Sequence, residues 1–78
     1  MMTLRIISPR GAMADIPAEK IFFPGVEGSF EILGNHAAII AALRGGDIRY
    51  EGPENGSIAI SSGFVRVKDN IVEAIVEL

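Results

Sequence analysis

The stretch from Phe64 to Leu78 reads FVRVKDNIVEAIVEL and holds two runs of alternating side chains around a polar pair, Asp69-Asn70. One face of the second run is apolar throughout, and the other mixes isoleucine with glutamate. The apolar face consists of Val72, Ala74, Val76 and Leu78, and the mixed face of Ile71, Glu73, Ile75 and Glu77. A period of two with one partly polar face is typical of antiparallel sheet, and the Asp-Asn pair suits a two-residue turn with positive φ. The stretch therefore predicts a β-hairpin of Phe64–Lys68 and Ile71–Leu78.

Short apolar or alternating segments recur along the rest of the chain, separated by glycine and proline. Asp47–Glu51 and Ser57–Ser61 flank the cluster GPENG, whose Asn-Gly dipeptide is a hairpin signal. Further strands are predicted at Leu4–Ser8, Ala12–Ile16, Glu19–Phe23 and Phe30–Leu33. Strands at this spacing, with turn residues between them, indicate an all-β sandwich or barrel. No linker, repeat or low-complexity segment divides the chain, so residues 1–78 are expected to form one domain.

The segment Ala37–Leu43, AAIIAAL, is ambiguous. Its alanines and leucine are good helix formers. A strand that is buried between two sheets would be equally apolar on both faces, and periodicity does not separate it from a short helix. The residues alone therefore leave helix and strand open for this segment.

Composition excludes several classes of function. The chain has 78 residues, 49% of them apolar, which is enough for one small packed domain and excludes disorder. Its net charge is −3 and its basic residues are scattered, so we expect no nucleic-acid partner. No apolar run approaches the ~20 residues of a membrane span, so we expect no membrane insertion, and the N-terminus has no signal-peptide pattern. The absence of cysteine excludes disulfides and thiolate chemistry.

Motifs for catalysis are equally sparse. The chain contains no phosphate-binding glycine motif and no HExxH, and a single histidine without cysteine does not form a usual zinc site. We therefore expect no cofactor and no metal. His36 and Ser61 would serve a small hydrolase only if they came within hydrogen-bond reach of each other. The glycine-rich loop around Gly25–Gly28, beside apolar strands, leaves a second alternative, a module that binds a small ligand or an extended peptide.

The segment Phe23–Tyr50, FPGVEGSFEILGNHAAIIAALRGGDIRY, resembles the signature of the epsilon subunit of F-type ATP synthases. The matching positions are Pro24-Gly25, Gly28, Phe30, Ile32-Leu33, His36-Ala37, Leu43, Gly46 and Ile48. A second family block resembles Ser61–Val67, and the opening Leu4–Gly11 fits a third. Three blocks in the right order and spacing make the resemblance specific, and it covers essentially the whole chain.

The resemblance implies a flattened antiparallel β-sandwich of about ten short strands, in which Ala37–Leu43 is an inner strand. It implies a non-catalytic central-stalk subunit that docks on the gamma subunit and the membrane rotor ring. There it would help to couple proton-driven rotation to ATP synthesis, at the cytoplasmic face of the bacterial inner membrane. The chain stops at Leu78, where the family's sandwich ends, so we expect neither the C-terminal helical hairpin nor its inhibition of hydrolysis.

The resemblance also implies contact residues. For the rotor ring these are Glu27, Ser29 and Glu31, and for gamma they are His36, Ile39, Ala41 and Ser61. The chain departs from the family pattern within the signature. Gly34-Asn35 stands in place of Pro-Gly, Glu31 in place of glycine, and Ser29 where many members carry an acid. The acidic charge is therefore expected to be shifted along the strand.

Overall fold

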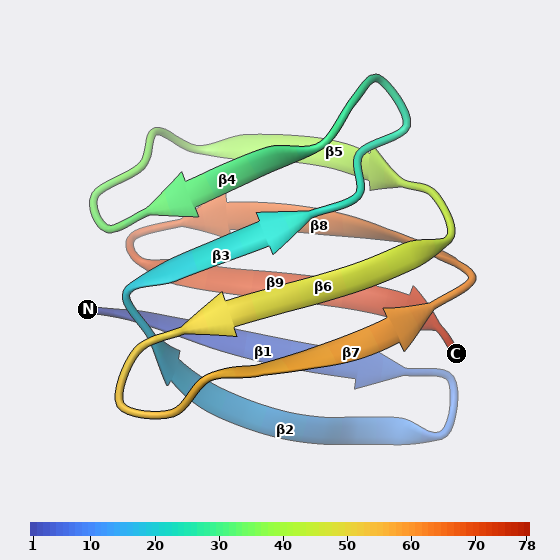
Figure 1. Cartoon of the computed structure of the whole chain (residues 1–78), viewed down its shortest axis with the longest axis horizontal. Coiled ribbons are helices and arrows are strands. Elements are labelled where there is room, and N and C mark those ends of the chain that lie inside the picture. Colours follow the sequence, from blue (N-terminus) through green and yellow to red (C-terminus); the bar gives the residue numbers. More distant parts are fainter.

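The computed structural model describes the backbone of residues 1–78 and the side chains of all residues except 12 and 13. It contains nine strands, as Figure 1 shows. They are β1 (Met2–Ser8), β2 (Gly11–Ala18), β3 (Lys20–Phe23), β4 (Phe30–Leu33), β5 (Ile39–Leu43), β6 (Gly46–Glu51), β7 (Gly56–Ile60), β8 (Ser62–Lys68) and β9 (Ile71–Glu77). The all-β prediction is confirmed, with nine strands in place of about ten. The ambiguous segment is a strand from Ile39 onward, and its first two alanines belong to the preceding loop. The expectation of an inner strand is wrong, because β5 is an edge strand of its sheet and its outer face is exposed.

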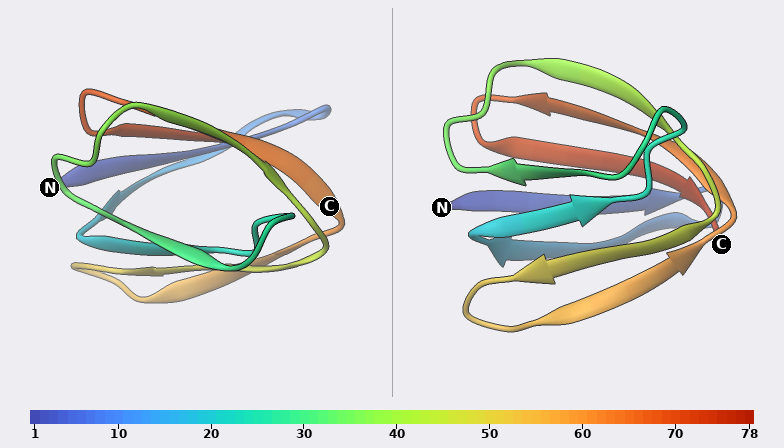
Figure 2. Two further views of the ribbon diagram at one scale, coloured as in Figure 1. Left: turned by 90° about the horizontal axis from the view of Figure 1, so that it is seen from above. Right: turned by 45° about the horizontal axis from the view of Figure 1, so that its top comes forward.

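The strands form two sheets that face each other across the core, as the two views of Figure 2 show. The five-stranded sheet has the order β2-β1-β9-β8-β5, and the four-stranded sheet has the order β4-β3-β6-β7. Neighbouring strands are antiparallel except β1 and β9, which run parallel from Thr3↔Ile71 to Ile7↔Ile75. The first and last strands of the chain therefore lie side by side in the larger sheet, with the N- and C-termini at opposite ends of it (Figure 1). The parallel pair is a departure from the expected antiparallel sandwich.

The hairpin predicted from the C-terminal stretch is confirmed. β8 and β9 pair from Ser62↔Glu77 to Lys68↔Ile71. Asp69 and Asn70 form the turn, with φ of 52° and 62°. The expected apolar face of β9 is buried except for Leu78, which follows the strand and is 60% exposed.

The core lies between the inner faces of the two sheets. Its largest fully buried side chains are Phe23, Met2, Leu4, Ile6, Ile21, Ile32, Ile48, Val65, Val72 and Val76. Burial of each Val, Leu, Ile, Met or Phe side chain contributes about 1.5–3 kcal/mol, which is how a chain of this size offsets its conformational entropy. Within the described residues no helix is long and apolar enough to cross a membrane.

Candidate docking surface

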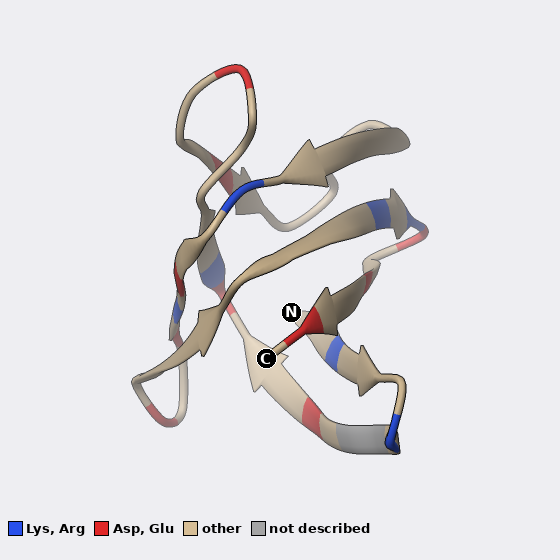
Figure 3. Cartoon of the chain, turned by 90° about the vertical axis from the view of Figure 1, so that its right-hand side faces the viewer, with Lys and Arg blue, Asp and Glu red and all other residues tan. Residues whose placement is uncertain are grey.

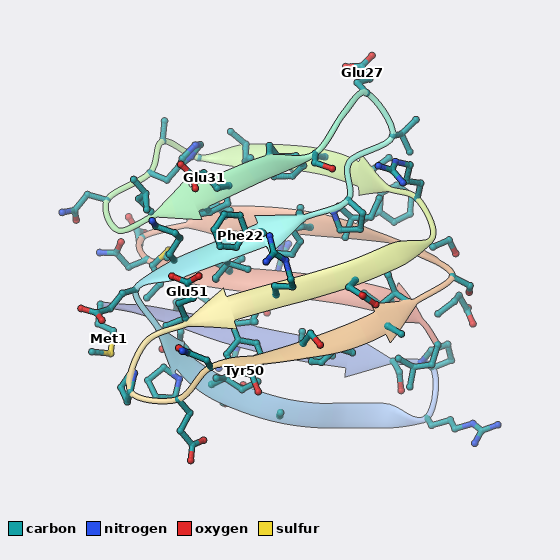
Figure 4. All side chains as sticks on the ribbon, in the orientation of Figure 1. Met1, Phe22, Glu27, Glu31, Tyr50 and Glu51 are labelled. Atoms are coloured by element: carbon teal, nitrogen blue, oxygen red, sulfur yellow. The ribbon has the colours of Figure 1, made fainter. Side chains whose placement is uncertain are left out.

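The outer face of the four-stranded sheet is charged. Lys20, Glu31, Asp47, Arg49 and Glu51 project from it, with Phe22 among them, as Figure 4 shows for the labelled members. The guanidinium carbon of Arg49 lies 4.6 Å from the centre of the Phe22 ring, and the Lys20 Nζ lies 5.9 Å from it. These cation–π contacts place charged groups over the Phe22 ring. This face is therefore polar enough to remain exposed to solvent.

The outer face of the five-stranded sheet is apolar along one row. The register places Ala42, Phe64, Ile75 and Ile7 side by side across β5, β8, β9 and β1. Phe64 is 59% exposed and Ile75 is 48% exposed, and Ile40, two residues before Ala42 on β5, is 79% exposed. We call Ile40, Ala42, Phe64 and Ile75 the apolar patch. A cluster of exposed aliphatic and aromatic groups of this kind marks a surface for contact with another molecule.

A row of ion pairs borders the apolar patch on one side. It lies on β1, β9 and β8, two residues along each strand from the apolar row. Arg5 Nε lies 3.0 Å from Asp15 Oδ1, and Arg5 Nη1 lies 3.5 Å from Glu73 Oε2. On the other side, Arg66 Nε lies 2.5 Å from Glu73 Oε1. The hydrogen bond from Arg66 holds the pKa of Glu73 below its ordinary value, and the bond to Asp15 raises the pKa of Arg5. The patch is therefore an apolar surface with charged groups along one side, a combination that protein interfaces also show between core and rim.

The loop between β3 and β4 projects from the edge of the sandwich, with an acidic tip in Figure 3. Both of its ends are fixed, because the rings of Phe23 and Phe30 stack with centroids 5.5 Å apart. Val26 N–H donates to Ala42 O at 3.0 Å, which joins the loop to the edge of β5. Gly28 turns the chain with a φ of +125°, a conformation that favours glycine. The loop is therefore fixed in position by the stacked rings and by its hydrogen bond to the edge of β5.

The residues expected at the rotor ring are all exposed, but they do not form one cluster. Glu27 lies at the loop tip and Glu31 on the charged sheet face near Phe22, so Figure 4 shows the two carboxylates well apart. Ser29 lies at the base of the loop, where Arg44 Nη2 approaches its Oγ at 3.5 Å. The structure thus adds Arg44 to this region, which sequence reasoning missed because it lies after β5.

The residues expected at gamma occupy both ends and the inner side of the five-stranded sheet. His36 is half-buried in the loop before β5, with its Nδ1 2.7 Å from Ala37 O. Ser61 lies at the opposite end, where its Oγ donates to Glu77 O at 3.2 Å. Ile39 and Ala41 are half-buried and pack against the core. The exposed positions of β5 are Ile40 and Ala42, which sequence reasoning missed because both faces of the segment are apolar.

The arrangement excludes the hydrolase hypothesis. Ile39 pairs with Val67 near one end of β8, whereas Ser61 precedes Ser62 at the other end. Five residues of strand separate these ends, or about 17 Å at ~3.3 Å per residue. The His36 ring and the Ser61 hydroxyl are therefore far outside hydrogen-bond reach, and a nucleophile–base pair is not formed.

The hollow beside the apolar patch offers little to a small ligand. It has a volume of about 850 Å³, lies on the outer face of the five-stranded sheet and is lined by residues such as Ile40, Arg66, Lys68 and Ile71. It is open, since Ile40 and Ile71 in its lining are 79% and 42% exposed. Ligand sites usually enclose most of the ligand surface, so an open apolar surface fits a protein partner better.

These features define a β-sandwich whose exposed apolar and charged surfaces suit contact with other proteins. Residues 1–77 match the family described as ATP synthase, Delta/Epsilon chain, beta-sandwich domain. The chain belongs to this family.

Relatives among curated proteins agree with the family. The ATP synthase epsilon chain of Desulfitobacterium hafniense is 45% identical over 73 residues, which cover 90% of this chain and 54% of that protein. The ATP synthase epsilon chain of Symbiobacterium thermophilum is 39% identical over 80 residues, covering 97% of this chain and 56% of that protein. The chain thus spans about half the length of these relatives.

Solved structures share the fold. A chain of the Tetrahymena thermophila mitochondrial ATP synthase, from a structure of its central stalk and c-ring, superposes with a TM-score of 0.81 at 21% identity. The match covers 99% of this chain and 63% of that one. A chain of the Euglena gracilis mitochondrial ATP synthase gives 0.87 at 22% identity, covering 96% and 49%. The expected β-sandwich is confirmed by this likeness.

Proposed function

We propose that this chain is a non-catalytic subunit of the central stalk of an F-type ATP synthase, where it docks on the gamma subunit and on the membrane rotor ring. The observation that carries the proposal is the apolar patch, in which Ile40 and Phe64 are 79% and 59% exposed on a chain of this family. The chain contributes no catalytic residue. It acts as a rigid body that passes rotation between ring and gamma, because densely packed interiors transmit strain.

Gamma covers the outer face of the five-stranded sheet in this proposal. His36 and Ser61 then mark the two ends of the contact surface, and the apolar patch forms its centre. Ile39 and Ala41 contribute only their solvent-accessible atoms to this contact, because both side chains pack against the core. An apolar surface with the ion row along one side supports the assignment, since stable interfaces combine the two.

The rotor ring meets the loop between β3 and β4. Glu27, Ser29 and Glu31 follow one another along the loop and β4, and all three are exposed. One carboxylate at the loop tip and one on the adjacent face of β4 favour a basic or polar partner, and they affect the rate and specificity of docking more than its strength. In this proposal the chain is a peripheral subunit at the cytoplasmic face of the bacterial inner membrane. To these 78 residues we assign docking and coupling, and no inhibition of hydrolysis.

The test replaces one apolar residue on each outer face with aspartate and measures binding to gamma from the same organism. Phe64→Asp should weaken binding at least tenfold, because a charge would be buried at the centre of the interface. Leu33→Asp is the matched control, since Leu33 is 46% exposed on the charged sheet, and it should bind as wild type does. Circular dichroism confirms that both variants fold. Wild-type affinity in Phe64→Asp would contradict the assignment of the gamma surface.

The ring contact is tested separately in the assembled complex. Glu27→Lys combined with Glu31→Lys should leave binding to gamma unchanged and lower coupled ATP synthesis in membrane vesicles. Glu19→Lys combined with Glu54→Lys is the control for the same change in charge, since both residues are exposed and lie outside the loop. If the double variant sustains ATP synthesis at the wild-type rate, the acidic loop does not contact the ring.

A further inference from the structure

Two segments that are distant in the sequence meet at one end of the sandwich. They are the loop 34–38 between β4 and β5 and the turn Asp69-Asn70 between β8 and β9, both on the left in Figure 1. Asn35 N–H donates to Asn70 Oδ1 at 2.6 Å, and Asn70 Nδ2 donates to Asn35 Oδ1 at 3.2 Å. One amide side chain thus binds both the backbone and the side chain of a residue 35 positions away. We call this pair the asparagine clip.

The Asn70 end of the clip is firmly held. Thr3 N–H donates to Asn70 O at 2.9 Å, and the turn joins two strands in the interior of the five-stranded sheet. The Asn35 end belongs to a loop that crosses from one sheet to the other. The other side-chain hydrogen bond of this loop among the described side chains is internal, from His36 to the adjacent Ala37. Among the described side chains, the clip is therefore the hydrogen-bonded link between this loop and the five-stranded sheet.

Both residues of the clip have a φ of 62°, in the left-handed region. Asparagine tolerates this region better than most residues, but glycine adopts it without cost. Glycine at either position would preserve the backbone and lose a side-chain hydrogen bond. Asparagine at both positions therefore satisfies the backbone geometry and supplies the contact between loop and turn.

We propose that the asparagine clip positions the loop 34–38 for the docking of gamma, with Asn70 as the positioning residue. The inference rests on the proposed function. The loop leads directly into β5, and Ala38 of the loop lines the open hollow together with Lys68 and Ile71 of the β8–β9 hairpin. The pairing of β5 with β8 begins only at Ile39, so the clip is what fixes the loop side of the hollow relative to the hairpin turn. A surface that is ordered before binding loses less conformational entropy when the partner arrives, so its affinity is higher.

The test uses Asn70→Gly, which keeps the positive φ and the backbone bond from Thr3 but removes the amide. Amide hydrogen exchange on the free chain should show that Asn35 exchanges at least tenfold faster in this variant. Affinity for gamma from the same organism should fall roughly tenfold. The double variant Asn35→Gly, Asn70→Gly should bind gamma no more weakly than Asn70→Gly alone, because the single substitution already removes the asparagine clip.

Asp69→Gly is the matched control. Asp69 lies in the same turn with a φ of 52°, but it is outside the clip. Because Asp69 also lines the open hollow, this control is read on the exchange of Asn35, which should be unchanged. Wild-type exchange of Asn35 in Asn70→Gly would overturn the clip, and faster exchange with unchanged affinity would overturn its role in docking. If the wild-type chain does not bind gamma, both the proposed function and the docking role of the clip are contradicted. The exchange of Asn35 then still shows whether the clip holds the loop.

Discussion

Gly25 lies where the projecting loop folds back on itself. A Cβ atom built on Gly25 would collide with Gly28 O and lie 2.8 Å from the Phe30 ring. Gly25→Ala should therefore destabilise the chain by about 1–3 kcal/mol, as overpacking does, measured by urea denaturation. Gly34→Ala is the control, because a Cβ there meets no atom within 4 Å and the φ is not left-handed. Its stability should stay within about 0.5 kcal/mol of wild type. Equal effects of the two substitutions would show that the loop can move away from Gly25.

Glu73 makes the stability of the chain depend on pH. The hydrogen bond from Arg66 keeps the pKa of this carboxyl below its ordinary value of 4.5 when the chain is folded. The unfolded chain therefore takes up the proton first, so the contribution to stability is complete above about pH 4.5 and is lost as pH falls through the folded pKa. Glu73→Gln should melt at a lower temperature than wild type at pH 7.

The difference between wild type and Glu73→Gln should shrink as the pH falls below 4.5. Thermal melts by circular dichroism across this range measure it. Glu54→Gln, outside the ion row, serves as the control for the loss of a carboxylate. A constant difference between wild type and Glu73→Gln at all pH values would contradict the role of the ionised carboxylate.

At the scale of elements, the β8–β9 hairpin could be read from the sequence and the orientation of β5 could not. The hairpin is local, since Asp69-Asn70 specifies the turn and Glu73 and Glu77 mark the outer face of β9. In β5 both faces consist of isoleucine and alanine, and only the burial of Leu43, at 3% exposed, fixes which face points inward. A shift of one residue exchanges the two faces. The patch residues Ile40 and Ala42 were missed for this reason.

The orientation of β5 is tested by one substitution at two adjacent positions. Ile39→Ala removes side-chain atoms that pack on the core and should cost about 1–2 kcal/mol, below the ~2–5 kcal/mol of a fully buried isoleucine. Ile40→Ala changes a side chain that is 79% exposed and should cost about 0.5 kcal/mol or less. Both variants lose the same intrinsic strand preference, so the difference reports burial. Equal costs in urea denaturation would contradict the inward orientation of Ile39.

For the whole molecule, the parallel pairing of β1 and β9 lay beyond sequence reasoning. Alternation within Leu4–Ser8 and Ile71–Leu78 predicts two strands but carries no information about which strands become neighbours. Only the extension of the apolar row to Ile7 depends on that pairing, because the apolar patch itself lies on β5, β8 and β9. The loop with Glu27 is local in the sequence, whereas the apolar patch is assembled from β5, β8 and β9. Phe64 and Ile75 were therefore not among the predicted contact residues.

The same pairing predicts how the chain unfolds. β1, β9 and β8 are interior strands of the five-stranded sheet, whereas β7 is an edge strand of the other. Amides in β1, β9 and β8 should exchange only by global unfolding, at about 4–12 kcal/mol for 78 residues. Amides of β7 should exchange at lower free energies. Because Ile6 is fully buried, Ile6→Ala should lower protection in all three interior strands by one shared amount of about 2–5 kcal/mol. If native-state exchange showed that Ile6→Ala lowers the protection of β1 but not that of β8, the pairing of β1 with β9 would not be part of the cooperative core.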